Sequence, residues 1–288
     1  MVFQRGVYRI SNSTVPIVVD LNRGDPTNGT AVTAWSDNGG LNQLWLAEET
    51  GEADTFTLRN LAGGTYMDLA RGSAAEQTNI EGWSRTGDNQ KWTIKRAIDG
   101  TSWKIQNYAS KTFADLYNGG DSDGTPIYGW TGTWDDDNSH QKWNFQRMSA
   151  TSAEVTLAIR NNPHLAHDYR GYLLDGEYLI LSADVWHQVW ATTGLGQGNK
   201  VWRSEIFDCD DFAVTMKAAV AAWGADNIRA DNCALLCGIM LGVNPNDPTD
   251  AHAYNFNLTN DHTGVIFYEP QTDQFLNDIG YNAYLAFF

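Results

Sequence analysis

Basic residues are scarce in this 288-residue sequence, in which 19 Lys and Arg stand against 35 Asp and Glu, giving a net charge of −16. Such a charge repels phosphate backbones and anionic lipid surfaces, so nucleic-acid binding and adsorption to membranes are disfavoured. The longest apolar run, residues 233–243, is too short to span a bilayer, and residues 1–6 lack the apolar segment of a signal peptide. We expect a cytoplasmic protein that does not insert into membranes.

Cysteine is also scarce, because Cys209, Cys233 and Cys237 are the only three. An odd number in a chain of this length does not make a disulfide framework, and no C-x-x-C pair or neighbouring histidine indicates zinc. We therefore expect reduced thiols. The 42% hydrophobic content indicates a globular protein, and the length predicts two domains. The abundant residue is tryptophan, with 12 copies.

The first half of the sequence contains one motif three times. Gln-x-Trp occurs at residues 43–45, 90–92 and 141–143, and each copy follows an Asp-Leu-x-x-Gly segment and a second tryptophan. Short strand-like runs separated by turn signals such as Asn28-Gly29 predict an all-β domain with pseudo-threefold symmetry. The equivalent polar and aromatic positions are Asp20, Trp35, Asn42 and Gln43, then Asp68, Trp83, Asn89 and Gln90, then Asp115, Trp130, His140 and Gln141.

These residue types suit a sugar site. A carboxylate accepts hydrogen bonds from adjacent hydroxyls, an indole face packs against the C–H face of a sugar ring, and an amide or imidazole adds a directed bond. We assign Trp45, Trp92 and Trp143 to the core. The motif glutamines could contact sugar or tie strands together, and the remaining tryptophans and aspartates could instead be a half-exposed turn scaffold.

The Gln-x-Trp repeat resembles the ricin B-chain family of β-trefoil lectins, and residues 1–148 carry all three copies. The resemblance implies that the twelve equivalent residues form up to three sites for galactose or N-acetylgalactosamine on glycoproteins or glycolipids. The third copy departs from the family by having His140 in place of asparagine. Trp134 adds a second ring near Trp130, which suggests an extended oligosaccharide.

The second half carries different chemistry, and we place the domain boundary between residues 149 and 150. Residues 151–161 are expected to be helical, and apolar residues at helical spacing predict a second helix that ends at Gly224. Cys209 precedes that helix, where the helix dipole stabilises a thiolate. A predicted hairpin, 251–258 with 265–271, brings His252 and Glu269 together. These three residues form a nucleophile, base and orienter.

Three acidic neighbours surround the thiol, namely Asp208, Asp210 and Asp211. Like charges raise the pKa of a thiol, and a bound divalent cation would reverse that effect. Asp210, Asp211, Glu269 and Gln271 offer oxygen ligands that suit calcium or manganese. In the alternative interpretation, Asp210 and Asp211 only complement the helix dipole.

The second half resembles the papain-like cysteine proteases, and the whole chain is similar to the Marasmius oreades agglutinin and related mushroom chimerolectins. The matching stretches are residues 202–213, 251–256, 267–271 and 276–281. The resemblance implies an α+β papain-like domain, a calcium-activated endopeptidase with Cys209, His252 and Glu269, and Trp202 near its cleft. It also implies a homodimer and a defence toxin that acts on a peptide substrate after ingestion or contact.

The sequence departs from the papain-like pattern at two positions, and two rival functions remain open. Glu269 stands where papain-like enzymes have asparagine, and Arg203 stands where they have glutamine, so the oxyanion donors are not identified. The first rival is a purely agglutinating dimeric lectin, whose C-terminal domain only dimerises it. The second is a glycoside hydrolase, which needs two paired carboxylates that Asp210 and Asp211 do not resemble.

Overall fold

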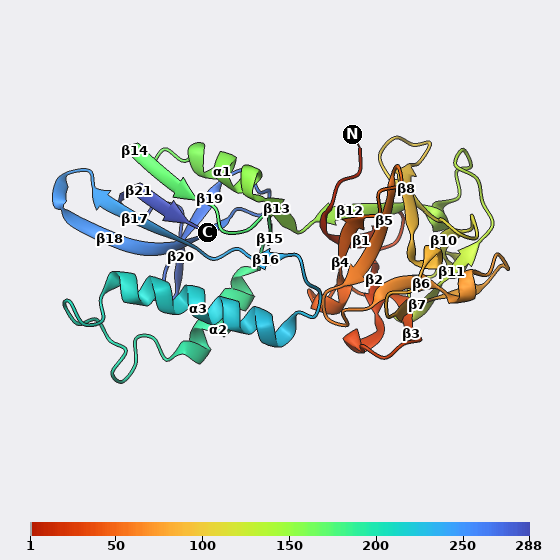
Figure 1. Ribbon diagram of the computed structural model, residues 1–288, viewed down its shortest axis with the longest axis horizontal. Helices are drawn as coiled ribbons and strands as arrows, with labels where there is room; N and C mark the ends of the chain where they lie inside the picture. Colours follow the sequence, from red (N-terminus) through yellow and green to blue (C-terminus); the bar gives the residue numbers. More distant parts are fainter. Residues whose placement is uncertain (1) are drawn as a thin grey trace. The chain divides into compact units, whose positions relative to one another are not determined.

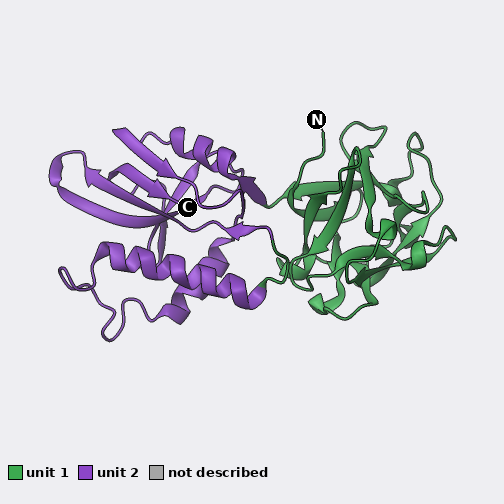
Figure 2. Cartoon of the chain, viewed as in Figure 1, with its two compact units in different colours: residues 1–148, 228–231 green, residues 149–227, 232–288 purple. Residues whose placement is uncertain are grey.

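The computed structural model describes residues 2–288 as two compact units (Figure 2). The first runs to residue 148 and includes residues 228–231, and the second comprises residues 149–227 and 232–288. Our predicted boundary lies one residue away, but it missed the short segment that returns to the first unit. That segment is held there because Arg229 N donates to Leu61 O at 2.8 Å and Arg59 Nη2 donates to Arg229 O at 3.0 Å.

The described residues of the first unit form twelve strands in three repeats of four, which confirms the predicted β-trefoil (Figure 1). All strand pairs are antiparallel; β12 returns to pair with β1, and β3, β7 and β11 pair with one another. The three repeats therefore share one closed core. The strands are β1 Gly6–Asn12, β2 Val18–Leu21, β3 Thr30–Trp35, β4 Leu44–Glu49, β5 Thr55–Asn60, β6 Tyr66–Leu69, β7 Thr78–Trp83, β8 Trp92–Arg96, β9 Trp103–Asn107, β10 Phe113–Leu116, β11 Thr125–Trp130 and β12 Trp143–Arg147.

The three motif tryptophans lie at the centre of this core, as predicted. Trp45, Trp92 and Trp143 are fully buried, and their indole N–H groups donate to the backbone oxygens of Val19, Met67 and Ala114 at 2.8–3.1 Å. A buried indole N–H needs such a partner, so the hydrogen bond fixes the ring orientation in each repeat. Because each repeat makes this hydrogen bond, a tryptophan recurs at the same position of the motif.

The backbone conformation explains why the Asp-Leu-x-x-Gly segment ends in glycine. A short 3-10 turn follows β2, β6 and β10, at η1 Asn22–Gly24, η3 Ala70–Gly72 and η5 Tyr117–Gly119. The last residue of each turn has a φ of 60–64°, which glycine adopts without steric cost. A second 3-10 turn carries each motif glutamine, at η2 Leu41–Gln43, η4 Asp88–Gln90 and η6 Ser139–Gln141. These turns place the aspartate and the glutamine of one repeat side by side.

The second unit is an α+β structure, as predicted (Figure 1). On one face of its main sheet, Ala213 of α3 (Cys209–Asn227) packs against Ile239 and Ala253. On the other face, α1 (Ser152–Arg160) packs with Met240 and Tyr254. The sheet is therefore covered by helices on both faces. The main sheet has the order β14-β21-β17-β18-β19-β20, and a small sheet has the order β13-β15-β16. The elements are β13 Ser149–Thr151, α1 Ser152–Arg160, β14 Leu165–Tyr172, β15 Glu177–Leu179, α2 Ala183–Thr193, α3 Cys209–Asn227, β16 Ala234–Leu235, β17 Gly238–Asn244, β18 Asp247–Leu258, β19 Val265–Glu269, β20 Gln274–Leu276 and β21 Asn282–Phe287.

The helix predictions are partly confirmed. The helix expected over 151–161 is α1, whose capping box joins Thr151 and Glu154. The predicted stop at Gly224 is wrong, because α3 continues to Asn227. A Cβ at Gly224 would lie 2.5 Å from Leu235 Cδ1, so glycine permits close packing there and does not end the helix. Among residues 2–288, no helix is both long and apolar enough to cross a membrane.

Candidate functional site

The three repeat aspartates are buried acceptors. Asp20, Asp68 and Asp115 are only 2–5% exposed, and burial raises the pKa of each carboxyl. In the first repeat, Asn42 Nδ2 and Gln43 Nε2 donate to the same oxygen, Asp20 Oδ2, at 2.8 and 2.9 Å. This arrangement leaves Oδ1 of Asp20 available for another donor.

The second repeat forms a cavity of about 590 Å³. Asn89 Nδ2 donates to Asp68 Oδ1 at 2.7 Å, and Trp83 lies in the cavity wall. The structure thus brings the predicted carboxylate, indole and amide of this repeat to one concave site. The lining residues are Asp68, Ala70, Arg71, Asn79, Glu81, Trp83, Thr86 and Asn89.

The third repeat uses an asparagine that the sequence analysis missed. Gln141 Nε2 donates to Asp115 Oδ2 at 2.9 Å, and Asn138 Nδ2 donates to the same oxygen at 3.3 Å. His140, the predicted residue, lies beside Gly119, as Asn42 lies beside Gly24, and its charge lowers the pKa of Asp115. Asn138, which precedes the turn, therefore supplies the amide donor that Asn42 and Asn89 supply in the other repeats.

The motif glutamines lie behind the sites and not in their walls. Gln43, Gln90 and Gln141 are at most 1% exposed. Gln43 Nε2 also donates to Ser36 O at 2.9 Å, and its Oε1 accepts from Asn38 N at 3.0 Å. Of the two roles left open above, the structure supports positioning, because these amides hold the aspartate and the loop that follows the exposed tryptophan.

The site tryptophans are more exposed than the core tryptophans. Trp35 is 36% exposed, and Trp83 and Trp130 are partly exposed, so each offers some ring surface. Trp134 packs edge-on against the buried Phe113, with ring centres 4.9 Å apart. The surface of Trp134 is thus partly used for packing, which weakens its expected role in holding a longer oligosaccharide.

Each site loop is fastened by a residue of another repeat. Asp123 Oδ1 accepts from Ser36 N and Oγ at 2.6 and 2.8 Å, and Asn28 Oδ1 accepts from Ser84 N at 2.7 Å. Thr131 Oγ1 donates to Glu76. The third repeat therefore clamps the first, the first clamps the second and the second clamps the third.

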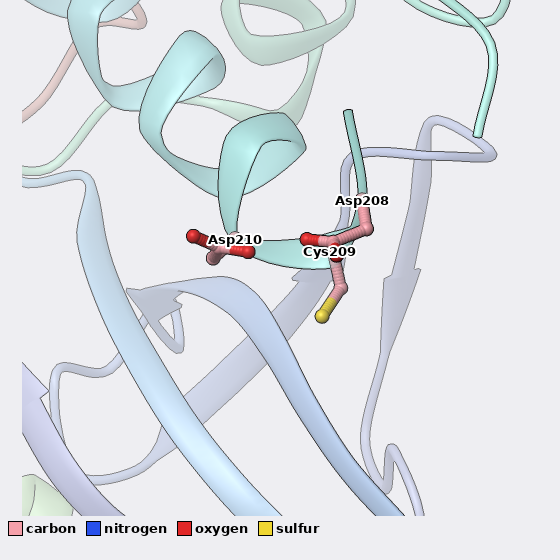
Figure 3. A group of neighbouring side chains, drawn as sticks. All are labelled: Asp208, Cys209 and Asp210. Atoms are coloured by element: carbon pink, nitrogen blue, oxygen red, sulfur yellow. The ribbon is translucent and has the colours of Figure 1, made fainter. Parts of the chain in front are cut away.

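The thiol of Cys209 lies at the first residue of α3 (Figure 3). Burial raises its pKa, hydrogen bonding from the backbone of Ala253 lowers it, and the charges of Asp208 and Asp210 raise it further. Figure 3 shows the sulfur pointing away from the helix. Cys209 packs with Ala253, the residue after His252 in β18.

His252 and Glu269 are paired across the predicted hairpin. His252 Nε2 lies 2.6 Å from Glu269 Oε2, and both side chains are 14% exposed. Gln271 N donates to Glu269 Oε1 at 3.0 Å, which fixes the carboxylate. The ring centre of Tyr281 lies 5.0 Å from that of His252. Burial and Asp250 raise the pKa of the Tyr281 hydroxyl, and the charges of Cys209 and Glu269 raise it further. This pairing leaves His252 Nδ1 for a second partner.

Helix α2, which the sequence analysis missed, braces the turn after Glu269. Trp190 Nε1 donates to Pro270 O at 2.7 Å, and His187 Nδ1 lies 2.7 Å from Asp273 Oδ1. Tyr268 donates its hydroxyl to the same Asp273 oxygen at 2.6 Å. The sequence held a signal for α2, since Trp186, Val189 and Thr193 have helical spacing and Gly194 follows with a φ of 70°.

The acidic residues near the thiol are arranged differently from the predicted cation site. Within residues 2–288, the one group of three potential metal ligands is Asp208, Cys209 and Asp210, whose ligand atoms lie within 4.8 Å of one another. Asp211 Oδ2 instead accepts from Asp208 N at 3.2 Å, as the helix-dipole alternative expects. Trp202, predicted near the cleft, is 58% exposed.

Comparisons with known proteins now place the chain. Residues 41–130 match the family described as ricin-type β-trefoil lectin domain-like, and residues 178–275 match the family described as agglutinin C-terminal. A comparison with curated protein sequences finds no match.

Two similar solved structures cover the whole chain. One is Polyporus squamosus lectin bound to Neu5Aca2-6Galb1-4GlcNAc, with 42% identity, and the other is a PSL1a–E64 complex, with 41% identity. In both comparisons the TM-score is 0.88, with 99% of this chain and 100% of the other covered. The chain therefore belongs to the mushroom chimerolectins that join a ricin B-type β-trefoil lectin domain to an agglutinin C-terminal domain.

Proposed function

We propose that the trefoil unit binds galactose-type glycans and that the second repeat is its best-formed site. The supporting observation is the cavity in which Asp68, Trp83 and Asn89 meet. An ordered carboxylate next to an indole face matches the hydroxyl and C–H faces of a pyranose. The similar Polyporus squamosus lectin is bound to a glycan that contains galactose.

Titration with lactose tests this function. Trp83→Ala should remove a stacking contact worth about 1 kcal/mol, which lowers the affinity of the second site roughly fivefold. Asp68→Asn should lower it by tenfold or more, because a hydrogen bond to a charged acceptor contributes about 1.5–3 kcal/mol. Trp134→Ala is the matched control, since this ring packs against Phe113. Unchanged lactose affinity in both site variants would contradict the proposal.

We further propose that the second unit is a cysteine endopeptidase. The specific observation in favour is the His252–Glu269 pair, together with a cysteine at a helix N-terminus that packs with Ala253, the residue after His252. In that arrangement His252 Nδ1 takes the proton of the Cys209 thiol, and Glu269 holds the imidazole in the required tautomer. One of the similar structures is a PSL1a–E64 complex. E64 is an epoxide that alkylates reactive thiols, so it is a suitable probe of Cys209.

We propose calcium or manganese as the activating ion. Asp208 and Asp210 share a hydrogen bond, which lowers the pKa of Asp208 and raises that of Asp210, so a cation could replace the shared proton. Asp211, Glu269 and Gln271 remain candidate ligands, although both Glu269 oxygens already have partners. When bound, the ion would offset the negative charge that opposes a Cys209 thiolate.

Labelling with E64 separates an endopeptidase from a purely agglutinating lectin. We expect one E64 adduct on Cys209 by peptide mass spectrometry, faster in calcium than in chelator. Cys209→Ala should lose both the adduct and peptide cleavage while keeping its lactose affinity, and Cys233→Ala is the matched control. No adduct at any calcium concentration would favour the agglutinating lectin, in which the second unit would serve only the proposed homodimer.

A further inference from the structure

The second sugar site contains a carboxylate that the repeat motif does not account for. Across each site hairpin the aspartate is paired with a residue of the next strand, and these partners differ. Asp20 pairs with Thr33, Asp68 with Glu81 and Asp115 with Tyr128. Directly paired residues on antiparallel strands have Cβ atoms about 5 Å apart, so Glu81 stands next to Asp68.

Glu81 lies where it can meet a ligand. It lines the cavity of about 590 Å³ with Asp68 and Trp83, and also an adjoining cavity of about 220 Å³ between β3, β7 and β11. Burial raises its pKa, Asp68 raises it further and Arg71 lowers it. Among residues 2–288, no hydrogen bond or ion pair is made to its carboxylate, in contrast to Asp123 and Glu76, which are used in the interrepeat clamps.

We infer that Glu81 sets the charge selectivity of the second site, which takes neutral galactose-type glycans and disfavours those carrying an acidic substituent. The inference rests on the proposed glycan binding. A carboxylate accepts from hydroxyl and amide N–H donors of a neutral sugar but repels a sialic acid carboxylate or a sulfate. Arg71 lines the same cavity, but its charge is opposed by two acids, Asp68 and Glu81. In the first repeat, Arg23 holds the equivalent position in its 3-10 turn, and the residue paired with Asp20 is the uncharged Thr33.

The test uses the full chain with Trp35→Ala and Trp130→Ala, so that binding reports the second site. Lactose and 6′-sialyllactose are titrated against this background and against its Glu81→Gln and Glu81→Thr derivatives. Glu81→Gln keeps the side-chain volume, and Glu81→Thr reproduces the first repeat. Two charges about 10 Å apart near a protein surface change affinity by about tenfold, and closer charges change it by more.

With Glu81 present, lactose should bind about tenfold or more tightly than 6′-sialyllactose, and raising the salt concentration should narrow that ratio. Both derivatives should reduce the ratio about tenfold and remove its salt dependence. An unchanged ratio in Glu81→Gln overturns the inference. If the background variant fails to fold, the same ratio is measured on the parent chain from the indole NMR signal of Trp83. Absence of lactose binding by every protein, the parent included, would instead overturn the proposed function.

Discussion

At the scale of single residues, burial of the repeat aspartates should give binding and stability opposite pH dependence. Burial raises the pKa of Asp20, Asp68 and Asp115 above the ordinary 3.8, and their amide partners lower it. Sugar hydroxyls need the ionised form, so lactose affinity should fall as pH falls through the raised pKa values. The folded chain binds more protons than the unfolded chain in that window, so the free energy of unfolding should fall as pH rises.

Calorimetric titration with lactose and urea unfolding between pH 4 and 7 measure the two quantities. In Asp68→Asn, the pH dependence of lactose affinity and the pH dependence of the free energy of unfolding should each lack the part that Asp68 contributes. The opposite pH dependence would be contradicted if lactose affinity and the contribution of the aspartates to stability both rose with pH.

Residue chemistry could be predicted where the repeat fixed the spacing, and could not where the loop length changed. The interval from the site tryptophan to the glutamine is 8 residues in the first repeat, 7 in the second and 11 in the third. In the third repeat, His140 keeps the position of Asn42 in the 3-10 turn, beside Gly119, but it does not supply the amide that binds the aspartate. Asn138 supplies that amide, because the longer loop presents it to Asp115.

At the scale of elements, the clamps between repeats should make a loop mutation act on a neighbouring site. Asp123 belongs to the third repeat, yet it binds both Ser36 N and Oγ beside Trp35. Asp123→Ala should therefore weaken the first site and leave the third unchanged. Loss of two hydrogen bonds at an exposed position should cost the loop about 1 kcal/mol, or about fivefold in affinity.

Indole NMR signals of Trp35 and Trp130 during a lactose titration resolve the two sites. Asp121→Ala, on the same turn but outside the clamp, is the control. A weakening confined to the third site in Asp123→Ala would show that this turn acts within its own repeat.

The secondary elements of the second unit show where local patterns stop being informative. The hairpin of β18 and β19 could be predicted because its residues alternate and its turn is marked. The end of α3 could not, because Gly224 is required by its close contact with Leu235, which lies outside the helix in β16. The juxtaposition of Cys209 with Ala253 likewise depends on tertiary packing, including Asn255 Nδ2, which donates to Ala213 O at 3.0 Å.

At the scale of the whole molecule, the first unit is discontinuous, so its stability depends on residues far along the chain. Arg59 joins the two parts of this unit. Its Nε donates to Gly64 O at 2.9 Å, its Nη2 to Arg229 O at 3.0 Å, and its Nη1 pairs with Asp231 at 3.0 Å. The Asp231 side chain is 82% exposed, whereas that of Arg59 is 16% exposed. The bonds to backbone oxygens should thus stabilise the unit more than the ion pair does.

Arg59→Ala should lower the free energy of unfolding of the first unit by about 2 kcal/mol, because two carbonyls lose a charged donor. Asp231→Ala should lower it by less than about 1 kcal/mol, as exposed ion pairs contribute little. For a domain of this size, the first change corresponds to a fall in Tm of about 4–8 °C. Scanning calorimetry of the full chain should show the fall only in the lactose-sensitive transition. Equal shifts in both variants would mean that the ion pair, and not the backbone contacts, holds the returning segment.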